Sequence, residues 1–133
     1  MYKQEYEKNG GVNKIKSFTD LNAYKEAHKL VLIIYKVTNK FPKEERYGLI
    51  NQMRRATVSI TSNIAEGFSR NTIKDKCQFY TLAQGSLTEL QSQLLISRDL
   101  SYLTKEDFNQ IANQTVIVNK LINGLKRIKH RNL

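Results

Sequence analysis

The chain has 133 residues, a length that fits one domain with a single hydrophobic core. Its 22 Lys and Arg against 12 Asp and Glu give a formal net charge of +10, which favours polyanionic partners and indicates nothing about fold. A single cysteine excludes an internal disulfide, and the longest purely apolar run, residues 30–34, is too short to cross a bilayer, so we expect a cytoplasmic protein without membrane association.

Residues 1–17 are polar and lack a helical period, so they are predicted to form a flexible N-terminal arm. Residues 18–129 then carry four amphipathic helical patterns, and residues 130–133 are a short basic tail. The chain contains one proline, which also favours long uninterrupted helices over a turn-rich sheet.

The first helix is predicted over residues 20–39, and it ends before Pro42 because the residue preceding a proline avoids the α region. Its apolar side chains, which include Leu32 and Tyr35, cover about half of the circumference, more than a bundle helix needs. This width indicates a second contact surface. Four lysines fall within about 60° of one another on the other side: Lys25, Lys29, Lys36 and Lys40.

The second helix is predicted over residues 42–67, with Pro42 in its first turn and Gly67 as its C-terminal glycine. A polar group beside a core must be hydrogen-bonded, or it destabilises the fold by about 1–3 kcal/mol. Such groups follow the edge of the core face here: Gln52, Arg55, Ser59, Asn63 and Glu66. This helix therefore either is locked to a partner surface or holds a site.

The third helix is predicted over residues 72–100, where Thr72 and Asp75 resemble a capping box. Its core face carries Phe79, Ala83, Leu87, Leu90 and Leu94, and a second polar stripe contains Ser86, Glu89 and Gln93. Gly85 lies in mid-helix, where glycine costs about 1 kcal/mol relative to alanine. We therefore expect another helix to approach closely at Gly85.

The fourth helix is predicted over residues 104–129, with the same cap signature at Thr104 and an apolar face that includes Ile117 and Val118. No acidic residue follows Asp107, and basic side chains gather in this region: Lys120, Lys126, Arg127, Lys129 and Arg131. Four helices of this length joined by short loops predict an all-α fold, an antiparallel, up-down-up-down four-helix bundle.

The sequence offers little for catalysis. Neither histidine has a cysteine or carboxylate at metal-ligand spacing, so no metal and no cofactor is expected. Glu66 and Glu89 are an alternative acid–base pair for a hydrolase. The favoured interpretation is a non-enzymatic protein in which a polar network sets helix register or partner identity. The members of that network are Arg55, Ser59, Asn63, Glu66, Ser86 and Glu89.

The basic surfaces are the stronger functional lead, because lysine and arginine faces bind the phosphates of RNA or DNA. The candidate nucleic-acid-binding residues are Lys25, Lys29, Lys36, Lys40, Lys120, Lys126, Arg127, Lys129 and Arg131. The alternative is a structural or protein-interaction module whose charge serves an acidic protein partner and that has no nucleic-acid role.

Four motifs carry a resemblance to a known family: Phe41-Pro42 with Glu45, residues 52–55, residues 62–67, and Gly85-Ser86 with Glu89-Leu90. Over residues 18–125 the chain resembles the small bacterial four-helix-bundle proteins encoded in intervening sequences of 23S rRNA genes. The accessory variability proteins of diversity-generating retroelements are related to them. The resemblance implies a homopentamer with a basic, nucleic-acid-binding surface. In the retroelement branch it also implies a reverse transcriptase and its RNA template as partners.

Overall fold

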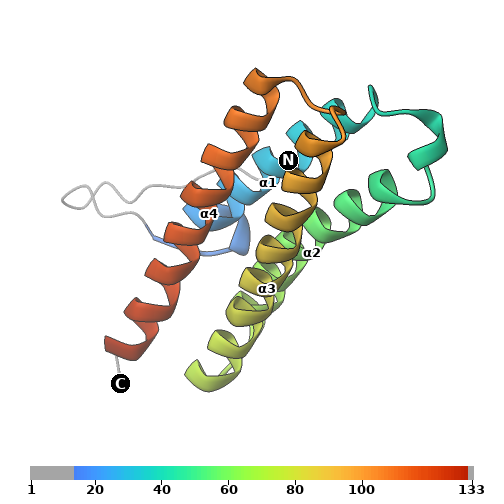
Figure 1. Ribbon diagram of the computed structural model, residues 1–133. Coiled ribbons are helices and arrows are strands. Elements are labelled where there is room, and N and C mark those ends of the chain that lie inside the picture. The colour runs from blue at the N-terminus through green and yellow to red at the C-terminus, as the bar shows by residue number, and fades with distance from the viewer. Residues whose placement is uncertain (1–13, 132–133) are drawn as a thin grey trace.

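The computed structural model describes the backbone of residues 14–131 and the side chains of residues 14–127. Four α-helices and two short 3-10 turns account for most of this part of the chain (Figure 1). In chain order they are η1 (Phe18–Asp20), α1 (Asn22–Thr38), η2 (Lys43–Glu45), α2 (Leu49–Ser69), α3 (Ile73–Asp99) and α4 (Lys105–Arg131). Residues 14–131 contain no β-strand, and the all-α prediction is confirmed. Most of the predicted N-terminal arm and the end of the tail lie outside the described residues.

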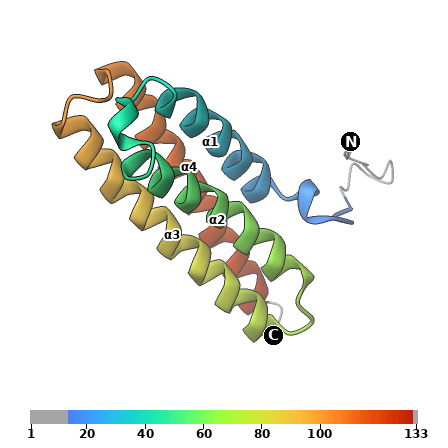
Figure 2. The same ribbon diagram turned by 90° about the vertical axis from the view of Figure 1, so that its right-hand side faces the viewer.

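The helices pack in a closed cycle, in which α1 contacts α2 and α4, and α3 contacts the same two helices. The contact between α2 and α3 is the most extensive, and Figure 2 shows these two helices side by side over most of their length. Each helix contributes fully buried side chains to one core, because apolar residues recur on one face of each. Among them are Leu30, Ile34, Met53, Ile60, Ile64, Leu87, Leu90, Leu94, Ile111, Val118 and Ile122.

The predicted start of the second helix at Pro42 is wrong. Pro42 is followed by the turn η2, and α2 begins only at Leu49, because the backbone of Gly48 has φ −109° and ψ −110°, outside the helical region. Glu45 then caps α2 from outside the helix, since its Oε1 accepts the Leu49 N–H at 3.1 Å. Its Oε2 accepts the Tyr102 hydroxyl at 3.0 Å, which ties this loop to the loop before α4.

Neither of the two mid-chain glycines has the role predicted for it. Gly67 does not end α2, which continues to Ser69. A Cβ added at Gly67 would lie 2.7 Å from Cε1 of Tyr80, so this glycine allows α3 to approach α2 closely. A Cβ at Gly85 would meet no described atom within 4 Å, so the close approach expected there does not occur within residues 14–131.

Two residues predicted to face the core lie at its edge. Tyr80, and not Phe79, is fully buried in α3, whereas Phe79 is half-buried beneath the guanidinium of Arg70, 4.5 Å from its ring centroid. Ile117 is 44% exposed, because its neighbour Val118 takes the buried position on α4. The predicted N-caps of α3 and α4 are confirmed: Thr72 Oγ1 accepts the N–H of Asp75 at 3.1 Å, and Thr104 Oγ1 accepts the N–H of Asp107 at 3.0 Å.

Candidate nucleic-acid interface

Intramolecular contacts divide the lysine stripe predicted on α1 into two kinds of side chain. Lys29 Nζ lies 3.1 Å from Glu26 Oε2, and Lys40 Nζ lies 3.4 Å from Asp107 Oδ2, so both ammonium groups have a carboxylate partner. No ion pair within residues 14–127 engages Lys25, which is half-buried, or Lys36, which is exposed. Within the described part of the chain, the charges of these two lysines are therefore uncompensated.

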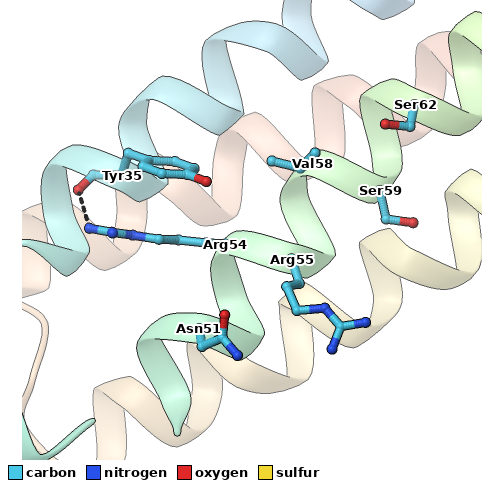
Figure 3. A pocket seen from close by; sticks show the side chains of 7 residues that line it. All are labelled: Tyr35, Asn51, Arg54, Arg55, Val58, Ser59 and Ser62. Carbon is cyan, nitrogen blue, oxygen red and sulfur yellow. Dashed lines mark hydrogen bonds between the residues drawn. The ribbon is translucent and has the colours of Figure 1, made fainter. Parts of the chain in front are cut away.

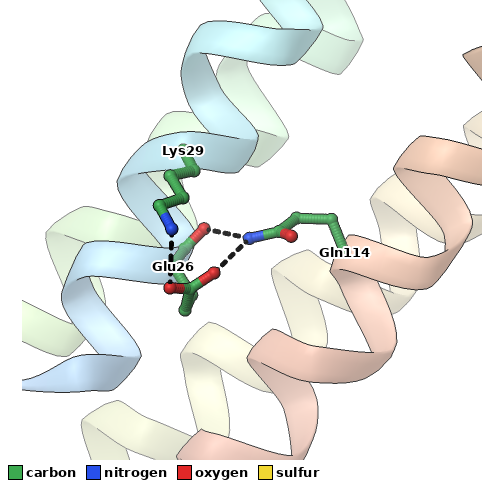
Figure 4. A network of polar contacts seen from close by, with 3 residues as sticks. All are labelled: Glu26, Lys29 and Gln114. Carbon is green, nitrogen blue, oxygen red and sulfur yellow. Dashed lines mark hydrogen bonds and ion pairs between the residues drawn. The ribbon is translucent and has the colours of Figure 1, made fainter.

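Glu26 connects the stripe to α4 (Figure 4). The Nε2 amide of Gln114 donates to both the backbone oxygen and Oε1 of Glu26, each at 2.9 Å. The Gln114 hydrogen bond first and the Lys29 hydrogen bond second lower the pKa of the Glu26 carboxyl below its ordinary value. Glu26 therefore links α1 to α4 through Gln114 and holds the ammonium group of Lys29 next to this contact.

The basic residues of α4 also differ from one another. Lys126 is half-buried, and its Nζ donates to Oε1 of Gln84 at 3.0 Å, while the amide of Gln84 donates to Asn119 and Asn123. Lys126 thus belongs to a polar seam between α3 and α4. Lys120 and Arg127 are exposed and have no ion-pair partner within the described side chains. The side chains of Lys129 and Arg131 lie outside the described residues.

The polar network predicted between the second and third helices connects through serine hydroxyls. Ser59 Oγ and Ser86 Oγ lie 2.8 Å apart across the α2–α3 seam, and Asn63 Nδ2 donates to Ser59 Oγ at 3.1 Å. Glu66 pairs with Arg70 of its own helix, and Glu89 accepts a hydrogen bond from Gln93 of its own helix at 3.4 Å. Both carboxylates are exposed.

A groove that the sequence reasoning did not anticipate opens beside this network, between the C-terminal end of α1 and the outer face of α2 (Figure 3). It has a volume of about 630 Å³, and its described lining includes two arginines and no carboxylate. We call it the Arg54–Arg55 groove. Its lining residues are Tyr35, Asn51, Arg54, Arg55, Val58, Ser59 and Ser62.

Arg54 is held rigidly in this groove. Its Nε donates to Thr38 Oγ1 at 3.0 Å, and its Nη2 donates to Asn39 Oδ1 at 3.0 Å and to the carbonyl of Tyr35 at 3.3 Å. The guanidinium lies over the ring of Tyr35, 4.5 Å from its centroid. Arg54 thereby caps the C-terminus of α1, and every one of these acceptors is neutral. No acidic side chain of residues 14–127 balances its charge.

One sequence signal pointed toward a contact surface at this place. The apolar arc of α1 was too wide for one contact surface, and Tyr35 at its edge is 41% exposed. Arg54 was not part of the predicted polar stripe, which contained its neighbour Arg55, because adjacent residues of a helix point about 100° apart. Only the packing of α1 against α2 brings Tyr35 and Arg54 together, because they are far apart along the chain.

The described side chains offer donors for anions. Two guanidinium groups, two serine hydroxyls and an amide line one groove, and none of its described lining residues is a carboxylate. Within the described residues no three His, Cys, Asp or Glu side chains are grouped to hold a metal ion. None of the helices searched there is long and apolar enough to cross a membrane.

Comparison with known proteins identifies a family and a shared fold. Residues 19–124 match the model of a family described as 23S rRNA-intervening sequence protein. A crystal structure of a protein of unknown function from the S23 ribosomal protein family of Bacteroides thetaiotaomicron superposes with a TM-score of 0.70 at 20% identity. That alignment covers 78% of this chain and 97% of the other, and it shows a shared fold. No curated protein matches the chain.

Proposed function

Because the chain belongs to the family of 23S rRNA-intervening sequence proteins, we propose that it is a non-enzymatic, oligomeric protein that binds nucleic acid or acts as an adaptor through basic surfaces. The observation that carries this proposal is the uncompensated positive charge. Lys36 on α1 and Lys120 and Arg127 on α4 are exposed and have no carboxylate partner within the described side chains, in a chain of net charge +10. Such a surface attracts the phosphates of a nucleic acid, and binding releases the counterions condensed on that nucleic acid. The proposal places this binding in the cytoplasm, where RNA and DNA are available.

The proposal includes an antiparallel, up-down-up-down helix order and assembly into a homopentamer. Short connections at residues 70–72 and 100–104 support the helix order, since such loops join adjacent antiparallel helices. An outward face of α3 supports self-association, because it combines Gly85 with two exposed apolar side chains, Leu82 at 52% and Ile96 at 47%. The number five follows from the family resemblance alone.

A salt titration tests the nucleic-acid role. Binding of labelled RNA and DNA is measured from about 50 mM to about 200 mM salt, and the logarithm of the association constant is expected to fall linearly with the logarithm of salt concentration. No binding at the lowest salt would refute the role. Light scattering of the same samples tests assembly, and Gly85→Glu, which adds charge to the α3 face, is expected to lower the measured mass.

The second candidate is a protein-interaction module that binds an acidic protein partner. The contacts of Lys29, Lys40 and Lys126 favour it, since three of the predicted nucleic-acid ligands already serve intramolecular contacts. The two candidates differ in one measurement. Replacing Lys120 and Arg127 by glutamine leaves nucleic-acid affinity unchanged if the second candidate holds, and lowers both the affinity and its salt dependence if the first holds.

A further inference from the structure

The Arg54–Arg55 groove has the features of a ligand site that the lysine faces lack. The lysines of α1 and α4 are separate point charges on convex helix surfaces. The groove is concave, has a volume of about 630 Å³ and holds one arginine in a fixed orientation. A donor that is already immobilised loses less conformational entropy when a ligand binds. A fixed donor beside a second guanidinium imposes a geometry on the anion that separate surface lysines do not impose.

Arg54 keeps donors for a ligand although it caps α1. Its Nε and Nη2 atoms make the three hydrogen bonds to Thr38, Asn39 and Tyr35, and Nη1 has no partner among residues 14–127. Thr38 is completely buried and its hydroxyl donates to the carbonyl of Ile34 at 2.6 Å, so the anchor itself is fixed. The two N–H groups of Nη1 are thus held at a constant place in the groove.

Arg55 supplies the second positive group. It is exposed and makes no hydrogen bond or ion pair with the described side chains. Figure 3 shows that Arg54 reaches toward α1 whereas Arg55 turns away from it. Two diverging guanidinium groups in one groove fit successive phosphates of a chain better than a single small anion. The ligand chemistry is therefore that of a phosphodiester polymer.

Tyr35 distinguishes a single strand from a duplex. Tyr35 as a whole is 41% exposed although the guanidinium of Arg54 lies over its ring, and Leu32, one turn before it on α1, is 57% exposed. An aromatic ring next to a fixed guanidinium is a stacking platform for an unpaired base, which a duplex does not present. Val58, 38% exposed, adds apolar surface to the same groove.

We propose that the Arg54–Arg55 groove is the site at which this protein binds single-stranded nucleic acid, with two successive phosphates on the arginines and a base on Tyr35. The proposal rests on the nucleic-acid role proposed above, and it assigns the main contacts to this groove rather than to the lysines of α1 and α4. The lysines of α1 and α4 then contribute long-range attraction, while the groove between α1 and α2 provides the contacts that require an unpaired strand.

Four single variants of the full chain test the site with a fluorescent oligouridine and with the duplex formed by oligouridine and oligoadenine. Val58→Glu places a carboxylate in the groove, and Val116→Glu makes the same change on α4, where the valine is 48% exposed. Arg55→Gln removes a charge that has no partner among the described side chains, and Tyr35→Leu removes the ring while it keeps the backbone carbonyl that Arg54 uses. Circular dichroism and thermal unfolding confirm that each variant is folded.

The expected result is a larger loss of oligouridine affinity for Val58→Glu than for Val116→Glu. Arg55→Gln lowers the slope of log affinity against log salt by about 0.7 for the single strand. Tyr35→Leu weakens oligouridine binding about fivefold or more and leaves duplex binding unchanged.

Different results overturn different statements. If the unmodified protein binds no nucleic acid at low salt, the nucleic-acid role fails and the site fails with it. If it binds but Val58→Glu and Val116→Glu have equal effects, or Tyr35→Leu weakens duplex and single strand alike, the groove is not the site and the role stands. Competition by inorganic phosphate as strong as that by oligouridine would show that the groove binds single anions.

Discussion

Substituting Gly67 by alanine adds one methyl group at the closest approach of α2 and α3. The new Cβ would lie 2.7 Å and 2.9 Å from two ring carbons of Tyr80 and 3.1 Å from the carbonyl oxygen of Lys76. Unstrained carbon atoms stay about 3.5 Å or more apart, so the ring overlap is roughly 0.8 Å. Tyr80 is completely buried, and the Lys76 oxygen belongs to the α3 backbone, so relief requires moving the helix.

The expected free-energy change is the difference between two terms. Overpacking of a core costs about 1–3 kcal/mol, and replacing glycine by alanine inside a helix returns about 1 kcal/mol. Because both a buried ring and a backbone atom must move, the upper half of the overpacking range applies, and Gly67→Ala is expected to lose about 1–2 kcal/mol of unfolding free energy. Urea denaturation followed by circular dichroism measures this loss.

Gly124→Ala is the matched control, because a Cβ at Gly124 in α4 meets no described atom within 4 Å. It is expected to gain about 1 kcal/mol from helix propensity alone. The two variants should therefore shift the urea midpoint in opposite directions. If Gly67→Ala stabilises the protein as Gly124→Ala does, the close contact with Tyr80 does not limit the packing of α2 on α3.

Three side chains, Tyr80, Tyr102 and Arg54, provide further tests of the structure. Tyr80→Phe removes a buried hydroxyl that has no partner among the described residues and is expected to stabilise the protein by about 1 kcal/mol in urea denaturation. Burial first and Cys77 second raise the pKa of Tyr80 to about 12, so alkaline spectrophotometric titration should show one late tyrosine that Tyr80→Phe lacks. The hydrogen bond to Glu45 raises the pKa of Tyr102 above its ordinary value of 10.0. The stability that this bond contributes is therefore complete below pH 10.0 and is lost as the pH rises through the raised pKa. Tyr102→Phe should accordingly lose less unfolding free energy at alkaline pH than the unmodified protein. Arg54→Gln removes the cap of α1 and should lower the unfolding free energy by about 1–3 kcal/mol, whereas Arg55→Gln, which breaks no described contact, should leave it unchanged.

Helix identity and most of the core could be predicted from the sequence, because helical periodicity is a local property. Met53, Ile60 and Ile64 recur at helical spacing, and all three are completely buried. The start of α2 could not be predicted in this way. Pro42 is acceptable in a first helical turn, but the loop that follows it is held by Glu45 through contacts with α2 and with Tyr102, which is distant in sequence.

The candidate site, like the fold, could be predicted from the sequence only in part. Composition alone indicated a basic protein and a polyanionic partner. It gave no means of separating Lys126, which donates to Gln84 across a helix seam, from Lys120, which is exposed. A positive side chain acts on a ligand only when its charge is uncompensated, and compensation depends on residues brought close by the fold.

The sequence by itself determined that this chain forms four amphipathic helices around one core and carries a strong excess of positive charge. Only the tertiary structure decided that Gly67, and not Gly85, is the glycine of close approach, and that Arg54 lies over Tyr35 beside an exposed Arg55. The physical reason is the range of the interactions. Helix periodicity arises between residues three and four apart, whereas a steric contact or a binding groove forms between helices whose spacing depends on every side chain in the core.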